Sequence, residues 1–275
     1  MRTSTDRLPG LTLTNLFLDV PLDHANDGAG TIEVFARVVT GEGGEDKPYL
    51  VFLQGGPGNE APRPSLGPDN PPWLRRALQD YQVVMLDQRG TGRSTPFGPA
   101  SDLAGSEATA EYLTHFRADE IVNDCEAVRE ALGARTWTIL GQSFGGFTAL
   151  HYLSVRPESL AGAVITGGLS AVQHPIEDVY AATWQIMVGK SEQYYRWFPG
   201  DRERIRQLTG LAAAGEIVLP NGDAVSPDRL RTLGHKLGAQ GGAEQLHYLL
   251  ELDHRSPAFA HDLAAALPFG ARNPL

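Results

Sequence analysis

One turn constrains the fold of this chain more than any other feature of its sequence. An apolar run at 137–140 predicts a strand, and the residues after Gly146 follow a helical pattern until Pro157. Between them stands GQSFGG, with Ser143 in its centre. Glycines two residues before and after the serine are a steric requirement, because a Cβ there would clash as the helix packs against the strand. The pattern predicts a nucleophilic serine at the tip of a strand–turn–helix; the alternative is a glycine-rich turn with an inert serine.

Other apolar runs predict further strands of the same sheet. The continuous runs at 49–53, 83–86 and 160–165 are typical of strands buried on both faces of a parallel sheet. The segments 16–20 and 32–39 predict a hairpin before them. Strands alternate with helical patterns, and glycine-rich turns follow their carboxyl ends. We therefore expect a doubly wound, mainly parallel α/β sheet whose functional site lies along that edge.

The single cysteine and the charge balance narrow the class of protein. Cys125 lies on the apolar stripe of a predicted helix at 117–133, so we expect a buried core thiol rather than a reactive one. One cysteine excludes an internal disulfide and a cysteine-based zinc cluster, which favours a cytoplasmic protein. A formal net charge of −10 argues against nucleic acid and anionic membranes as partners.

The character of the sequence changes near residue 172. Residues 1–171 carry the predicted strands, whereas 172–275 contain helical patterns rich in aromatic residues and one strand-like piece at 216–219. We expect an α/β core in the first part and a mostly helical cap domain in the second, inserted over the carboxyl edge of the sheet. The alternation of Arg202, Arg204 and Arg206 with acidic residues predicts a solvated helix face.

A nucleophilic serine also needs donors for an oxyanion. The backbone N–H of Phe144 is one candidate, and an N–H of the Gly55-Gly56 turn is the other, because glycine lets the main chain approach a substrate carbonyl closely. The Gly56–Pro57 bond is a candidate cis peptide, although an ordinary proline turn is the favoured expectation.

Three glycine-rich segments together resemble a known family. They are QGGPG at 54–58, DQRGTGRS at 87–94 and GQSFGG at 141–146, each placed after a predicted strand. They are similar to segments of the proline iminopeptidases, also called prolyl aminopeptidases, a branch of the α/β-hydrolase superfamily. The long-chain bacterial members match best, over nearly the whole chain. For Asp87 and Arg89 we expect buried hydrogen bonds that brace the loop rather than a catalytic role.

The resemblance implies an α/β-hydrolase fold and a serine aminopeptidase that releases N-terminal proline from peptides through an acyl-enzyme on Ser143. It implies neither a metal nor an organic cofactor. Such an enzyme must hold a cationic N-terminus, which requires carboxylates, and in the resembling family the cap provides them. Glu251, near Tyr248, is the first candidate, and Glu177 and Asp178 follow; for each, the alternative is a solvated helix residue.

The acid and the histidine of a serine triad are not found in this sequence. In the superfamily both follow the serine, after the cap, next to the last strands. No two buried strand runs follow residue 172, and none of the eight histidines fits the expected place. We therefore expect a C-terminally truncated chain that lacks the last strands and leaves an apolar sheet edge at 160–165.

Two alternatives to a prolyl aminopeptidase stay open. Another serine hydrolase, such as an esterase, would share the fold and Ser143 but would not depend on a free α-amine. A catalytically inactive fragment would lack the triad acid and histidine. The sequence predicts neither the substrate length nor the oligomeric state.

Overall fold

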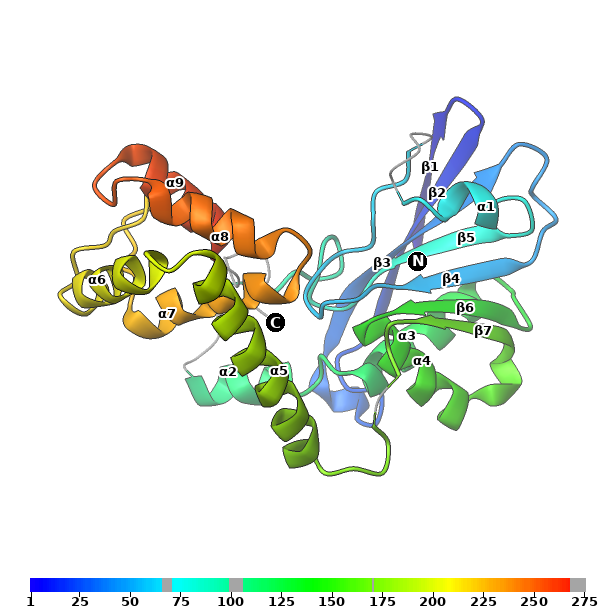
Figure 1. Ribbon diagram of the computed structural model, residues 1–275. Coiled ribbons are helices and arrows are strands. Elements are labelled where there is room, and N and C mark those ends of the chain that lie inside the picture. Colours follow the sequence, from blue (N-terminus) through cyan, green and yellow to red (C-terminus); the bar gives the residue numbers. More distant parts are fainter. Residues whose placement is uncertain (66–70, 99–105, 170, 268–275) are drawn as a thin grey trace. The chain divides into compact units, whose positions relative to one another are not determined.

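The computed structural model describes residues 1–65, 71–98, 106–169 and 171–267. These residues form two compact units, 1–169 and 171–267 (Figure 1). The first unit is a sheet flanked by helices, and the second is built from helices.

The sheet of the first unit has, in its described residues, seven strands in the order β1-β2-β3-β5-β4-β6-β7. β5, β4, β6 and β7 run parallel to one another, whereas β1, β2 and β3 are antiparallel neighbours that join the sheet beside β5. The strands are β1 Arg2–Leu8, β2 Leu11–Pro21, β3 Thr31–Gly41, β4 Tyr49–Leu53, β5 Gln82–Asp87, β6 Trp137–Gln142 and β7 Leu160–Thr166. The predicted mainly parallel α/β sheet is confirmed.

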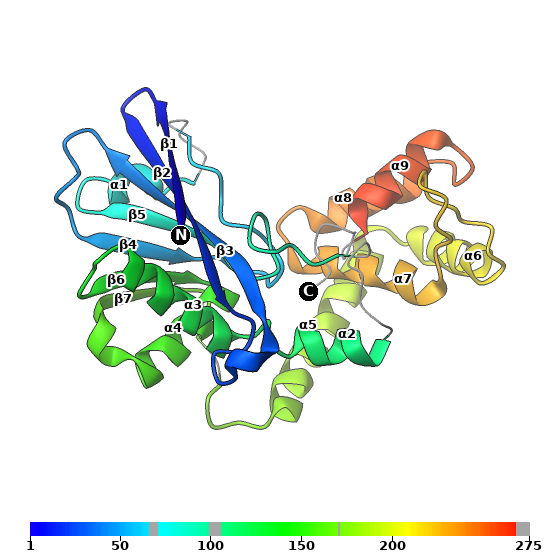
Figure 2. The ribbon, with the colours of Figure 1, turned by 180° about the vertical axis from the view of Figure 1, so that it is seen from behind.

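The central strands are buried on both faces, as their continuous apolar runs predict. Val51 and Leu53 of β4 belong to a core that also includes residues of α3 and α4, whereas Leu50 and Phe52 belong to a second core beside α1. Successive side chains of a strand point to opposite faces, so one short strand supplies both cores. Figure 2 shows α3 and α4 side by side over the sheet. The helices of this unit are α1 Leu74–Ala77, α2 Ser106–Leu113, α3 Ala118–Ala131 and α4 Phe144–Val155.

The two edge strands differ in how far the sequence predicts them. β1 was not predicted, because all of its residues are exposed and no apolar alternation marks it. β7 forms the strand predicted at 160–165, but none of its residues is buried, so the expected burial on both faces was wrong. It shows the apolar edge that was also expected there. Among the described residues β7 pairs with β6 alone, and Val164 is 49% exposed.

The helix predicted at 117–133 is α3, and its cysteine is a core residue as expected. Cys125 is fully buried. Burial, together with the neighbouring charges of Asp124 and Glu126, raises the pKa of its thiol well above the usual value. A thiol in this environment stays protonated and packs as a small apolar side chain.

The second unit packs its helices around an apolar core of its own, which includes Leu208, Leu246 and Phe259. The strand-like piece predicted at 216–219 forms only an isolated bridge, Val218 with Ala224. Of the predicted cap domain, residues 268–275 lie outside the described residues, and its role as a cap stays a prediction. No helix in the described ranges combines the length and hydrophobicity that crossing a membrane requires. The helices are α5 Ile176–Trp197, α6 Asp201–Ala213, α7 Pro227–Arg231, α8 Gly242–Glu251 and α9 Pro257–Ala266.

Candidate functional site

Ser143 lies between β6 and α4 in a backbone conformation that side chains rarely adopt. Its φ is 53° and its ψ is −119°. The main chain fixes this conformation, because the Ser143 N–H donates to the Thr166 carbonyl at 2.9 Å and its own carbonyl accepts from Gly146 at 2.8 Å. The residue is exposed, and no described residue forms a hydrogen bond with its hydroxyl. The backbone of this turn is therefore strained, and it leaves the Ser143 hydroxyl accessible.

Neighbouring glycines leave the space that this turn needs. A Cβ added to Gly145 would lie 1.9 Å from the Leu53 carbonyl oxygen, and one added to Gly141 would lie 2.3 Å from the Gly145 carbonyl oxygen. Both distances are far below van der Waals contact, and each opposing atom belongs to the backbone. The steric requirement inferred from the sequence is confirmed at both positions.

The turn after β4 runs directly past the serine. A Cβ on Gly55 would lie 2.9 Å from the Ser143 Cβ, so the backbone of this turn and the serine are in contact. Gly56 has a φ of 129°, and the Gly56–Pro57 bond is cis, so the favoured expectation of an ordinary proline turn was wrong. Phe144, the first residue of α4, has an N–H without an acceptor inside the helix. The partial positive charge of a helix N-terminus adds to the attraction for an anion there.

Asp87 braces the loop that follows β5. Its buried carboxylate accepts two hydrogen bonds from the Arg63 guanidinium, at 2.9 and 2.8 Å. It also accepts from the backbone N–H groups of Ala61 at 3.1 Å and Arg93 at 2.9 Å. The four bonds satisfy the charge and fix the loop, as expected for a structural residue.

Arg89, two residues after Asp87, is also buried and makes its own set of hydrogen bonds. Its guanidinium donates to both carboxylate oxygens of Asp124, at 2.7 and 2.6 Å. It also donates to the carbonyls of Leu22 at 2.7 Å and His115 at 2.8 Å. The predicted bracing role is confirmed for both residues. The charged partner of Asp87 is Arg63, and that of Arg89 is Asp124.

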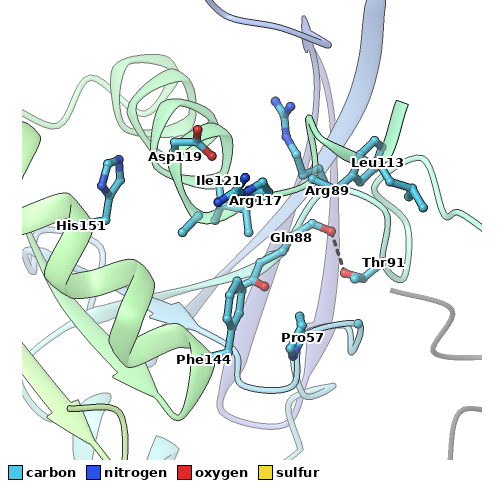
Figure 3. A pocket seen from close by; sticks show the side chains of 13 residues that line it. Pro57, Gln88, Arg89, Thr91, Leu113, Arg117, Asp119, Ile121, Phe144 and His151 are labelled. Carbon is cyan, nitrogen blue, oxygen red and sulfur yellow. Dashed lines mark hydrogen bonds between the residues drawn. The ribbon is translucent and has the colours of Figure 1, made fainter. Parts of the chain in front are cut away.

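A cavity of about 620 Å³ opens beside the turn. Figure 3 shows Phe144 and Pro57 on one side of it and Arg117, Asp119 and Ile121 on another. Phe144 thus connects the cavity to the serine turn, although Ser143 itself does not line it. The space is large enough for a small peptide.

In the second unit, Glu251 lies at the end of α8 with its side chain 52% exposed. Its carboxylate oxygen Oε1 is 3.4 Å from Nε2 of His247, one helical turn earlier. Nδ1 of the same imidazole is 2.9 Å from Oδ2 of the buried Asp201. The other two candidate carboxylates, Glu177 and Asp178, are exposed in the first turn of α5. Within the described ranges, no group of three or more His, Cys, Asp or Glu residues is arranged to hold a metal ion.

Comparison with known proteins identifies the family. Residues 48–207 match the model of the alpha/beta hydrolase fold. The chain belongs to the α/β-hydrolase family. The matched range contains β4 to β7, the serine turn and the loop of Asp87.

Curated relatives of this chain are proline iminopeptidases, in agreement with the resemblance found in the sequence. It is 41% identical to the proline iminopeptidase of Aeromonas sobria over 98% of the chain and 64% of that protein. It is 34% identical to a proline iminopeptidase of Aspergillus aculeatus over 85% of the chain and 54% of that protein. The chain therefore spans about two thirds or less of the length of the curated relatives it matches. A structure of a proline iminopeptidase-related protein from Thermus thermophilus matches 55% of the chain with 28% identity and a TM-score of 0.37.

The predicted site residues fall into two groups in the structure. Ser143, Phe144, Gly55 and Gly56 lie together in the first unit. Glu251 belongs to the second unit, and no described histidine of the first unit forms a hydrogen bond with the Ser143 hydroxyl.

The sequence reasoning missed the buried bonds of Asp201 and His247, which lie 46 positions apart. Arg204 is exposed on α6, as the predicted solvated face requires, but the prediction did not include its buried partner. The Arg204 guanidinium donates at 2.8 Å to Asp201, whose side chain is only 1% exposed. Asp201 follows Gly200 at the first position of α6, where an acid is common for local reasons. Only its burial distinguishes it, and no local pattern reveals burial at a single polar position.

Proposed function

We propose that this α/β-hydrolase chain carries the nucleophile of a serine aminopeptidase that releases N-terminal proline from peptides. The observation that carries the proposal is the strained, exposed Ser143 with the Gly55 backbone against it. Support also comes from two relatives, 41% and 34% identical to the chain, that are proline iminopeptidases. A fold alone would not select this reaction, because the α/β-hydrolase scaffold hosts many chemistries.

In the proposed reaction, the Ser143 hydroxyl attacks the carbonyl carbon of the N-terminal proline and loses its proton to a base. The oxyanion accepts hydrogen bonds from the Phe144 N–H and from an N–H of the Gly55-Gly56 turn. The C–N bond then breaks, the shortened peptide leaves with a proton on its new amine, and the proline remains as an ester on Ser143. Water hydrolyses the ester and restores the hydroxyl. No residue of the first unit is assigned as the base.

Recognition of the free amine is assigned to Glu251. A proline N-terminus carries a positive charge and two N–H donors, which a carboxylate can accept. Glu251 is exposed enough to meet a substrate, and its helix C-terminus adds a partial negative charge. Peptides are accordingly the expected partners, without a metal or cofactor. We also infer a cytoplasmic location, supported by the single buried Cys125.

The test uses the full-length natural protein and a proline anilide whose cleavage releases a chromophore. Ser143→Ala should lower turnover by roughly 10⁴-fold or more, because it removes the hydroxyl that forms the acyl-enzyme. Ser154→Ala is the matched control, since its exposed hydroxyl lies on the same α4 and bonds only to the Leu150 carbonyl among described groups. Turnover that survives Ser143→Ala would reject the role of this serine.

A blocked substrate separates the aminopeptidase from an esterase on the same fold. An N-acetylated proline anilide lacks the cationic amine and should not be cleaved. Cleavage of the acetylated anilide or of simple acyl esters at comparable rates would favour the esterase. Labelling of the wild-type protein, but not of Ser143→Ala, by a fluorophosphonate would report an activated serine independently of the substrate.

A further inference from the structure

A buried carboxylate joins three helices of the second unit. Asp201, at the start of α6, accepts hydrogen bonds from the Tyr194 hydroxyl of α5 and from the Arg204 guanidinium at 2.8 Å. Its oxygen Oδ2 is also 2.9 Å from Nδ1 of His247 on α8. Its side chain is 1% exposed, so these groups replace the water that an exposed carboxylate would bind.

The surroundings keep Asp201 ionised. Burial by itself disfavours the charged form, but the hydrogen bonds from Tyr194, His247 and Arg204 outweigh it and lower the pKa of the carboxyl. An ionised Asp201 is an acceptor only, so Nδ1 of His247 must carry the proton of the bond between them.

The imidazole of His247 is fixed in its plane as well as at one nitrogen. The Phe198 ring stacks on it with a centroid distance of 4.0 Å and an interplanar angle of 12°. Nδ1 is held by Asp201, and Nε2 on the other side of the ring lies 3.4 Å from Oε1 of Glu251, within ion-pair distance. The contact is attractive when Nε2 also carries a proton, because the positively charged ring then lies between two carboxylates.

We propose that Asp201 and His247 are positioning residues for Glu251, and that they turn its second oxygen toward the ammonium group of the substrate. This inference rests on the proposed aminopeptidase function. A half-exposed glutamate at a helix end otherwise moves among several rotamers, and ordering it on binding costs affinity. The ion pair with the protonated imidazole of His247 restricts Glu251 before the substrate arrives. Neither Asp201 nor His247 touches the substrate in this arrangement.

The positioning role predicts how Michaelis constants respond in a double-mutant cycle on the full-length natural protein. With the proline anilide as substrate, Glu251→Gln should raise KM roughly ten- to a hundred-fold, because a charge-assisted bond to the amine is lost. His247→Gln should raise KM about three- to ten-fold and change kcat less than about three-fold. In the Glu251→Gln background, His247→Gln should have no further effect on KM, because nothing is left to position.

Glu244→Gln is the matched control, since Glu244 is an exposed glutamate on the first turn of the same helix. It should leave KM and kcat unchanged. A readout without substrate is the ¹⁵N chemical shift of the His247 imidazole. Its Nε2 signal should move on Glu251→Gln and stay in place on Glu244→Gln.

The outcomes distinguish two failures. A wild-type protein that does not cleave the anilide rejects the proposed function, and the positioning role with it. If the protein cleaves the anilide but the KM increases caused by Glu251→Gln and His247→Gln multiply in the double variant, the positioning role alone is rejected. A kcat loss of several orders of magnitude in His247→Gln would also reject it, because such a loss indicates a group acting on the reacting atoms. A Nε2 signal that ignores Glu251→Gln would show that the contact does not exist in solution.

Discussion

The turn at Ser143 and the cluster around Asp201 fix functional groups in opposite ways. At Ser143 the backbone does the positioning: the residue is strained, and its neighbours are glycines because any added atom would meet a carbonyl. At Asp201 the side chains do the positioning, through hydrogen bonds from three helices to one buried charge. An added atom at the glycines should therefore destabilise the Ser143 turn, whereas the loss of the Asp201 charge should destabilise the second cluster.

The sharpest test of this contrast is Gly145→Ala. Alanine normally favours a helix over glycine, but here its Cβ would lie 1.9 Å from the Leu53 carbonyl oxygen in the adjacent strand. We expect the free energy of unfolding to fall by about 4 kcal/mol or more, because neither backbone can move away without breaking the sheet. Urea unfolding followed by circular dichroism measures the loss. A change below about 1 kcal/mol would contradict the packing of the turn.

Asp201→Asn should have the next largest effect, with a different cause. The substitution keeps the shape but removes the charge that Arg204 and His247 face, and we expect a loss of about 3 kcal/mol at neutral pH. Because the folded-state pKa of Asp201 is lowered, its ionic contribution is fully present above the unfolded value, about 4, and is lost as the pH falls through the folded value. The stability difference between wild type and variant should therefore narrow below about pH 4. A difference that stays constant to pH 2 would contradict this explanation.

The same contrast explains how much of the molecule its sequence predicts. The turn was predictable because its geometry requires particular residue types at fixed spacing: glycine at 141 and 145 around Ser143. β4 was predictable because burial on both faces makes a whole run apolar. The relations of Asp201, His247 and Glu251 depend on which faces of α6 and α8 pack together, and no local spacing encodes that.

β1 shows the same limit in the sheet. Its seven residues are exposed and polar enough to read as a loop, and its place depends on pairing with β2. In the candidate site, Glu251 was predicted from the resemblance and from its place near Tyr248, whereas no signal in the sequence marks the histidine that contacts it. Local sequence patterns thus predict the features that backbone geometry requires, such as the serine turn. Features that depend on tertiary contacts, such as β1 and the His247 contact, are not predicted.

Ser143→Gly should stabilise the protein, by about 1 kcal/mol, while abolishing the proposed activity. A φ of 53° with a ψ of −119° is costly for serine and costs glycine little, although glycine has more entropy to lose on folding. Ser143→Ala keeps the Cβ and therefore the strain, so the glycine variant should be the more stable of the two. Parallel urea curves for the two inactive variants make the comparison. Equal midpoints would show that the turn is not strained.

The smallest expected effect comes from Gly210→Ala, the counterpart of Gly145→Ala in the second unit. Gly210 lies inside α6, and a Cβ added there meets no atom within 4 Å. Alanine should therefore raise the stability by roughly 0.5–1 kcal/mol, because it lowers the entropy of the unfolded chain and favours the helix. The two substitutions are chemically identical, and both lie in helices. If the two changes in the free energy of unfolding have opposite signs in the same urea assay, close backbone packing, and not helix propensity, requires glycine beside Ser143. A destabilising Gly210→Ala would contradict this explanation.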